Sequence, residues 1–523
     1  MKKTNGILDY ISQFSLEDVL SGIIEMQILL YGSDVDSLLP ASEYLATNAL
    51  FACKQEGNRR FEWADYLQLE TYCKNFFAPS IDQFLLEALS LVNANEKEKE
   101  EYLKSLHMRL KNTAFRGDGY LHQLMYFANK LYAPLDQEIK NKLGFTFTSC
   151  EKMIIHINHV YCERIEKVYR EKNKVKNVLK TFCKRERLQL PSIKAGYIYR
   201  IDKTDLHEII DQDEVNSICN YLCVKAYEGS FKEVENDEFK ILLSKPFVDF
   251  GDYIYMPLLL PTLMNLPKLF HYTFIAEKIF DKDVMGVYTK YRGNLVEDFA
   301  LQCFKRLVPE ENIFKSLQYK DASGEADVTV CRPEGSLFCE CKSKILTLNA
   351  LKGINESIKE DVYKAIGMAY NQAVRSIKYV QDGKAFIVCE NGVEQEIYID
   401  NTDEKYIVCL TAENFGMIPS EITKYIELDK EVCIIPYAVN IFDLDIITQE
   451  CNSYNEFLGY LHFRQNNFDI LSAVDELDIF GYYKMYGDIK IEIDGDELHI
   501  MDCTKQFDRK YYKKDKEYLQ RCR

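Results

Sequence analysis

The stretch Gly324-Glu325-Ala326-Asp327-Val328 is followed, thirteen residues after its aspartate, by Glu340-Cys341-Lys342. Both segments belong to short apolar runs that predict β-strands, and Pro333 and Gly335 between them predict a turn. Buried charges are costly unless they are paired or bind a metal ion. The polar residues inside these two strands therefore mark the first place to look for a functional site.

The alternation of side chains along a strand places these polar residues together. Glu340 and Lys342 share one face of the second strand, and the apolar residues between them share the other. Asp327 is expected to point away from its apolar neighbours, which are Ala326, Val328 and Val330. A hairpin of this kind brings two carboxylates, Asp327 and Glu340, to one divalent cation. Lys342 beside them is then suited to orient and activate a water.

Two flanking helical patterns add further candidates. Residues 292–307 predict a helix on which Glu297 faces the apolar side, where it would bind a second metal ion or hold the water of the first. The alternative for Glu297 is a carboxylate favoured by the helix dipole. Residues 361–377 predict a second helix that carries Gln372, a candidate contact to substrate phosphate or to a metal-bound water. The alternative for Gln372 is an ordinary surface glutamine.

These residues resemble the PD-(D/E)XK superfamily of restriction-endonuclease-like nucleases through the order Glu297, Asp327, Glu340, Lys342 and Gln372. The resemblance covers residues 286–450 and implies a mixed sheet flanked by helices and hydrolysis of a phosphodiester with Mg²⁺ or Mn²⁺. It implies metal ligation by Asp327, Glu340 and the backbone carbonyl of Cys341, with Glu297 as the helix carboxylate. It also implies that Lys342 positions the water. Ala326 stands where the family often has proline.

Length and composition agree with a large, multidomain chain. The 523 residues predict two to four domains, and a hydrophobic content of 47% suffices for sizeable cores. The 17 cysteines have no disulfide-like spacing and favour reduced thiols and a cytoplasmic location. The N-terminal residues lack the pattern of a secretory signal. The apolar stretches are too short to cross a membrane.

The charge opposes a nuclease, because nucleic-acid binders usually carry a basic surface. The net charge is −17, and residues 286–450 hold 18 basic and 27 acidic residues. Two segments have the opposite balance, residues 170–187 and the tail 505–523, which contains Phe507, Tyr511, Tyr512 and Tyr518. Each is a candidate for gripping phosphates with aromatic stacking, or else a solvated helix face. The remaining acidic surface favours protein partners or solubility.

The order of periodic segments predicts a multidomain α+β protein. Residues 1–190 are expected to form a helical domain for sensing, recognition or oligomerisation, and 191–285 a mixed α+β connection. Residues 286–450 are expected to form the nuclease-like α/β domain with a mixed central sheet. Residues 451–523 are expected to form a helical or mixed segment that ends in the basic tail.

We therefore expect a cytoplasmic Mg²⁺-dependent endonuclease that acts on DNA in preference to RNA. Through analogy of fold alone, bacterial restriction or phage defence is the expected setting. The helical half is expected to bind a protein partner or a second copy of the chain. Two alternatives stay open: a nuclease subunit that is silent until a partner releases it, and a catalytically inert scaffold with the nuclease fold. The complete set of site residues argues against the second.

Overall fold

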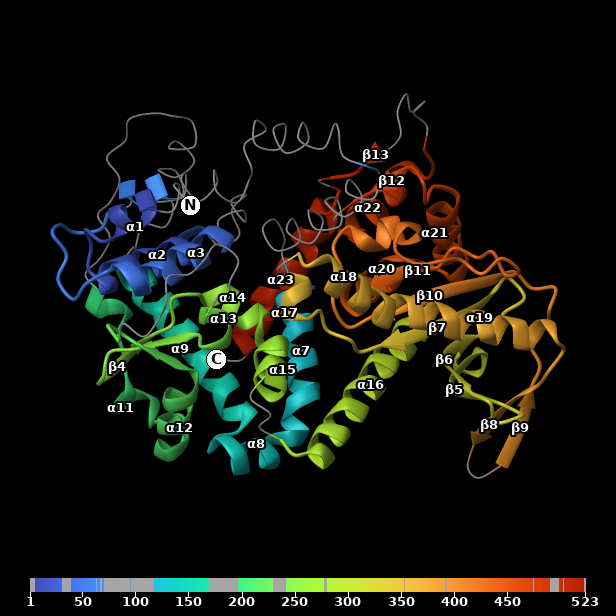
Figure 1. The fold of residues 1–523 in the computed structure, drawn as a ribbon, viewed down its shortest axis with the longest axis horizontal. Coiled ribbons are helices and arrows are strands. Elements are labelled where there is room, and N and C mark those ends of the chain that lie inside the picture. Colours follow the sequence, from blue (N-terminus) through green and yellow to red (C-terminus); the bar gives the residue numbers. More distant parts are fainter. Residues whose placement is uncertain are drawn as a thin grey trace.

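The computed structural model describes residues 5–30, 39–62, 64, 65, 68, 69, 95, 117–168, 196–228, 241–276, 280–351, 353–390, 393–473, 475–489, 498–501 and 503–521. The N-terminal helices lie to one side of the molecule, and a seven-stranded sheet lies to the other (Figure 1). Helix α16 (Lys282–Phe304) runs from the helical half to the sheet (Figure 1). The protein is thus a mixed α+β protein, as the sequence predicts.

The helical half begins with α1 (Asn5–Ile11), α2 (Leu16–Leu30), α3 (Leu39–Ala52), α7 (Leu121–Tyr132), α8 (Asp136–Leu143) and α9 (Phe147–Val168). Residues Leu16–Leu30, in which apolar side chains recur at three- and four-residue spacing, form α2. The basic segment 170–187 lies outside the described residues. Among the described residues, no helix is long and apolar enough to cross a membrane.

A small four-stranded sheet and several short helices follow. Its order is β1-β4-β3-β2, with bounds β1 (Ile201–Asp202), β2 (Cys223–Lys225), β3 (Phe247–Asp249) and β4 (Tyr253–Tyr255). The helices here are α11 (Lys203–Leu206), α12 (Gln212–Leu222), α13 (Ile241–Ser244), α14 (Leu259–Met264) and α15 (Leu266–Ala276). Strands β3 and β4 pair antiparallel and form a hairpin that turns at Gly251. Gly251 has φ 99°, a conformation that glycine adopts without strain.

The large sheet has the order β11-β10-β7-β6-β5-β8-β9. Its strands are β5 (Ile313–Tyr319), β6 (Glu325–Val330), β7 (Ser336–Lys342), β8 (Phe386–Glu390), β9 (Val393–Ile397), β10 (Lys405–Thr411) and β11 (Tyr437–Asn440). Strands β5, β6 and β7 pair antiparallel, as predicted for the β6–β7 hairpin, whereas β10 pairs parallel to β7 and β11 parallel to β10. The sheet is therefore mixed.

The chain between β7 and β10 supplies the helices on one face of this sheet. They are α17 (Leu348–Leu351), α18 (Asn355–Val362), a π-helical turn (Tyr363–Gly367) and α19 (Met368–Gln381). The helix predicted at 361–377 is thus interrupted by the π-helical turn. The helix predicted at 292–307 begins ten residues earlier, because the Asp281 carboxylate caps α16 by accepting from the Val284 N–H at 3.0 Å.

Two hydrophobic clusters cover the two faces of the large sheet. The first joins Cys339 and Val408 to Val296 of α16, and the second joins Phe338 to Ala369 and Ala373 of α19. Helices α16 and α19 therefore pack on opposite faces. All four segments expected from the sequence contribute side chains to the first cluster. Their boundaries stay predictions.

One expectation about β6 is wrong. Val328 and Val330 belong to the first cluster as predicted, but Ala326 belongs to the second. The reason lies on the neighbouring strand, where Ser316 has a left-handed φ of 52°. Ser316 stands opposite Asp327 between the pairs Lys315↔Val328 and Leu317↔Ala326, with no extra residue in either strand. On both strands the apolar side chains pass from the first cluster to the second at this point.

The C-terminal part packs back on the body of the protein. It comprises α20 (Ile441–Glu450), α21 (Tyr454–Asn466), β12 (Leu471–Ser472), α22 (Glu476–Tyr486), β13 (Leu498–His499) and α23 (Lys505–Arg521). Short 3₁₀ helices lie at Ala133–Leu135, Gly196–Tyr199, Glu310–Asn312 and Ile418–Lys424. Helix α23 lies beside α7 in the middle of the molecule (Figure 1).

The basic tail uses its aromatic side chains for this packing. Tyr511 is fully buried and stacks on Tyr120 with 5.1 Å between ring centroids. Its hydroxyl donates to the Glu450 carboxylate at 2.6 Å, and Phe507 is also buried. These two rings, considered from sequence as stacking partners for bases, are therefore part of the core.

Candidate functional site

The site lies where the β6–β7 ladder ends. The last paired residues are Val328 and Cys339, so Asp327 and Glu340 are the next residues on facing strands. Instead of continuing the ladder, the Asp327 carboxylate accepts a hydrogen bond from the Cys341 N–H at 2.8 Å. Both acidic side chains are buried, with relative exposures of 8% for Asp327 and 0% for Glu340. The hairpin thus brings the two predicted carboxylates together.

Glu340 is the least satisfied acidic group of the site. Neither of its carboxylate oxygens has a hydrogen-bond partner among the described residues. Burial raises its pKa well above the usual value and the Asp327 carboxylate raises it further, while Lys342 and the nearby Asp327 backbone act in the opposite direction. A buried carboxylate that accepts no well-formed hydrogen bond is stable only as the neutral acid or with a cation beside it.

Lys342 lies beside Asp327 and is partly exposed. Its Nζ lies 3.7 Å from Asp327 Oδ2 and donates to the Cys341 carbonyl at 3.2 Å. The side chain is 20% exposed, so solvent reaches part of it, whereas the two carboxylates are buried. This placement suits a group that contacts both a water and the substrate.

Glu297 reaches the site from α16 and is half-buried. Burial, followed by the nearby Asp327, raises its pKa, and Lys315 lowers it. Lys315 Nζ lies 3.5 Å from Glu297 Oε2 and 2.6 Å from the carboxylate of Asp298, which is exposed. Sequence reasoning missed Lys315, because a lysine in a strand that is polar on one side has no distinguishing pattern. The positive charge of Lys315 partly compensates the negative charge of Glu297, the third carboxylate of the site.

Gln372 lies on α19, which packs on β7. Its amide oxygen is buried and has no partner among the described residues, while its backbone carbonyl accepts from the Ser376 hydroxyl at 3.3 Å. Within the part of the chain that the structure describes, its side chain makes no hydrogen bond to Asp327, Glu340 or Lys342. Gln372 is thus half-buried rather than an ordinary surface glutamine, but it is not joined to the carboxylates.

The donor set fits Mg²⁺ or Mn²⁺. The described residues contain no group of three or more His, Cys, Asp or Glu side chains that would hold a metal ion on their own. Mg²⁺ does not require such a cage, since it is usually bound by one or two carboxylates, water and substrate phosphate. Asp327, Glu340 and the Cys341 carbonyl supply three hard oxygen donors. Burial keeps the pKa of the Cys341 thiol well above its usual value, which disfavours a soft, thiolate-bound metal.

The segment after Lys342 is held by acidic side chains that the sequence did not reveal. The Asp361 carboxylate accepts from the Thr347 N–H at 2.6 Å and pairs with Lys344 at 2.8 Å. Asp361 is 2% exposed and precedes the π-helical turn. Only the fold brings it beside residue 347, so no local pattern marks it.

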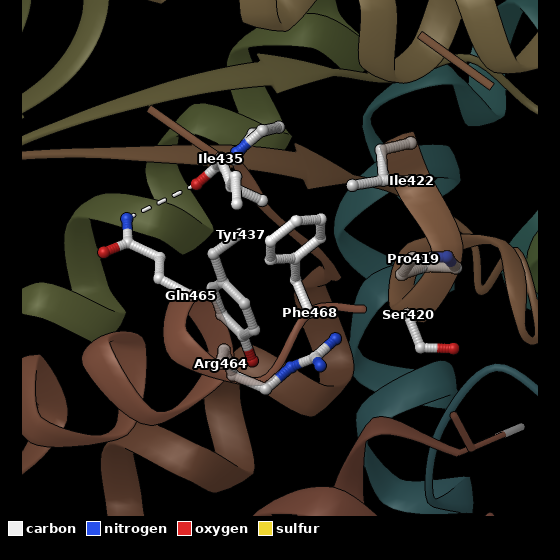
Figure 2. A pocket seen from close by; sticks show the side chains of 9 residues that line it. Pro419, Ser420, Ile422, Ile435, Tyr437, Arg464, Gln465 and Phe468 are labelled. Atoms are coloured by element: carbon white, nitrogen blue, oxygen red, sulfur yellow. Dashed lines mark hydrogen bonds between the residues drawn. The ribbon is translucent and has the colours of Figure 1, made fainter. Parts of the chain in front are cut away.

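Pockets elsewhere are less suited to chemistry. The pocket in Figure 2 lies between Ile418–Lys424 and α21 and encloses about 10 Å³, room for roughly one water. Its arginine, Arg464, is already paired with Glu476 at 3.0 Å. A larger cavity of about 260 Å³ lies between α7, α16 and α20, and its Arg306 is likewise paired with Asp445 at 2.6 Å.

Comparison with known proteins adds no relative to these observations. No family model matches the chain, and neither a curated protein nor a solved structure matches it significantly. Function is therefore argued from the geometry and chemistry of the site itself.

Proposed function

We propose that this protein is a Mg²⁺- or Mn²⁺-dependent nuclease of the PD-(D/E)XK type that hydrolyses phosphodiester bonds, those of DNA in preference to RNA. The observation that carries the proposal is Glu340, a fully buried carboxylate with two unpartnered oxygens beside Asp327 and Lys342. An ionised carboxylate in this position destabilises the fold until a cation lies beside it, so stability alone does not explain its place in the sheet.

The architecture around the site supports the same proposal. The resemblance implies a mixed sheet with flanking helices, and the seven-stranded sheet has α16 and α19 on opposite faces. Glu297, Asp327, Glu340 and Lys342 come from three separate elements, α16, β6 and β7, and lie around the end of one strand pair.

In the proposed mechanism, Asp327, Glu340 and the Cys341 carbonyl hold the ion. When bound, such an ion polarises the scissile phosphate and makes a water more acidic. The Lys342 amino group donates to that water or to a phosphate oxygen and so aligns attack on phosphorus. Glu297, whose pKa is raised, is placed to accept the proton that the water releases. The water oxygen bonds to phosphorus while the bond to the leaving oxygen breaks.

The test is a cleavage assay on plasmid, linear duplex DNA, single-stranded DNA and RNA with Mg²⁺, Mn²⁺ or EDTA. Wild type should cut only with metal, and Glu340→Ala should not cut. Glu334→Ala is a matched control, because Glu334 lies in the β6–β7 turn and, among the described residues, forms an ion pair with Arg332 alone, at 2.7 Å. The substrate that is cut selects the class, and no metal-dependent cutting of any substrate rejects the proposal.

A partner-gated form of the same nuclease is the second candidate. Its support is the net charge of −17 and the near-complete burial of Asp327 and Glu340. An acidic surface discourages unassisted contact with nucleic acid. A protein partner or a second copy on the helical half, in a cytoplasmic restriction or defence setting, would then supply the release. Cutting that begins only after a purified partner is added favours this candidate.

A further inference from the structure

The loop 343–347 that follows Lys342 is held through both peptide groups of one residue, Leu346. The Leu346 N–H donates to Glu413 Oε2 at 2.7 Å, and its carbonyl accepts from the Tyr272 hydroxyl at 2.9 Å. Glu413 lies just after β10, whereas Tyr272 lies on α15 of the helical half. These two contacts come from parts of the chain that are remote in sequence, and they act on the loop together with Asp361, which holds Thr347 and Lys344.

An ion pair with Lys268 fixes the buried Glu413 in turn. Lys268 Nζ lies 2.5 Å from Glu413 Oε1 and 2.5 Å from Asp118 Oδ2. The Glu413 side chain is fully buried. Burial alone would lower the pKa of Lys268, but Asp118 and Glu413 together raise it above its usual value. Lys268 therefore stays charged.

Lys268 and Tyr272 act from one face of one helix. They are four residues apart on α15 and so lie one above the other. One holds Glu413 and the other holds the Leu346 carbonyl. We call Lys268, Tyr272 and Glu413 the Leu346 clamp.

The clamp lies directly beyond the catalytic end of the sheet. Lys342 pairs in register with Thr411, and the Ala412 N–H donates to the Lys342 carbonyl at 3.2 Å. Glu413 is the next residue along that strand end. The backbone of Lys342 is therefore held from one side by its pairing with β10, and the loop that follows it is held by the clamp.

We propose that the Leu346 clamp is a positioning device through which α15 sets the backbone of Lys342 for hydrolysis. The inference rests on the proposed function and extends it to the helical half. Lys268, Tyr272 and Glu413 do not touch the substrate in this account. They act through Lys342, whose amino group must lie within a fraction of an ångström of its productive position.

The test uses Tyr272→Phe, which removes a single hydroxyl. We expect kcat on the cleaved substrate to fall about tenfold while KM stays within about twofold, since alignment rather than binding is lost. Hydrogen exchange of peptides covering residues 343–351 should become faster. Tyr132→Phe is the matched control. The Tyr132 hydroxyl donates to the Pro267 carbonyl at 2.5 Å, and Pro267 lies on α15, as Tyr272 does, but away from the loop. That variant should keep wild-type kcat and loop exchange.

A second pair of variants tests the ion pair. Lys268→Met should lower kcat and speed loop exchange in the same way, and Lys268→Arg should restore both in part by restoring the charge. Wild-type kcat and loop exchange in folded Tyr272→Phe and Lys268→Met overturn the clamp while leaving the nuclease intact. An equal fall in kcat for Tyr132→Phe also overturns it. A wild-type protein that cuts nothing with either metal instead overturns the proposed function.

Discussion

At the scale of single residues, Glu340 is the buried carboxylate of the site whose hydrogen-bonding capacity is least satisfied. It is the only one of the described site carboxylates with both oxygens unpartnered. Asp327, one strand away, is anchored by the Cys341 N–H at 2.8 Å. Glu297, on the helix, has Lys315 beside it at 3.5 Å. A cation would therefore stabilise Glu340 more than Asp327 or Glu297.

The burial of Glu340 predicts that the stability of the metal-free protein depends on pH. The pKa of Glu340 is raised on folding, so the folded protein binds its proton more tightly than the unfolded chain does. Stability should therefore fall as pH rises from the unfolded pKa toward the folded one, by about 1.4 kcal/mol for each pH unit in that window. Thermal denaturation in EDTA should show this fall for wild type and not for Glu340→Gln.

Adding Mg²⁺ should remove much of the difference in stability between wild type and Glu340→Gln, because the ion binds the ionised carboxylate of Glu340. A gap in Tm between wild type and Glu340→Gln that is constant across pH and metal would contradict this account of the site.

Lys342 gives a second prediction at this scale. Lys342→Ala should abolish cleavage, since no other described amino group lies as close to Asp327, 3.7 Å away. The fold should be kept, because the side chain is 20% exposed and its removal leaves no large cavity. Single-turnover cleavage, with circular dichroism to check folding, measures both. Cleavage at the wild-type rate would reject the assignment of Lys342.

At the scale of elements, the β6–β7 turn is packed too closely for a larger residue. A Cβ on Gly335 would lie 2.7 Å from the Tyr406 ring and 3.1 Å from Leu458. Gly335→Ala should therefore destabilise the protein by about 1–3 kcal/mol. Gly286→Ala on α16 is the control, because nothing lies within 4 Å of its added Cβ, and it should be neutral or stabilising. Chemical denaturation compares the two, and equal stability would contradict the packing described for the turn.

The same elements show what the sequence could predict. The strands that carry Asp327 and Glu340 were predictable, because period-two alternation is a local signal. The face of Ala326 was not, since it depends on the left-handed Ser316 of a neighbouring strand. Lys315 and Tyr272 were missed for a related reason: their roles come from contacts with residues that are 17 or more positions away.

At the scale of the whole molecule, the two halves share one core rather than meeting at a polar surface. The first hydrophobic cluster includes Leu20, Phe299 and Tyr511, which lie near the start, middle and end of the chain. The Lys268–Glu413 ion pair joins α15 to the chain just after β10 at 2.5 Å. The helices that precede the large sheet are therefore placed to influence the proposed site.

The docked C-terminal helix gives the prediction at this scale. Tyr511→Ala should lower the free energy of unfolding by about 3–5 kcal/mol, because a fully buried ring and its bond to Glu450 are lost. Lys513→Ala, at a lysine whose side chain is 78% exposed, should change stability by less than about 0.5 kcal/mol. Urea denaturation measures both. Unchanged stability of Tyr511→Ala together with lost nucleic-acid binding would instead assign the ring to substrate stacking.

The central claim is that Asp327 and Glu340 hold a divalent ion for phosphodiester hydrolysis. The most direct measurement is Mn²⁺ binding by electron paramagnetic resonance, made with cleavage of DNA on the same preparations of wild type and Glu340→Gln. We predict that wild type binds Mn²⁺ and cuts, and that Glu340→Gln, which keeps the shape of the side chain, does neither. Equal Mn²⁺ binding and equal cleavage by the two proteins would contradict the account.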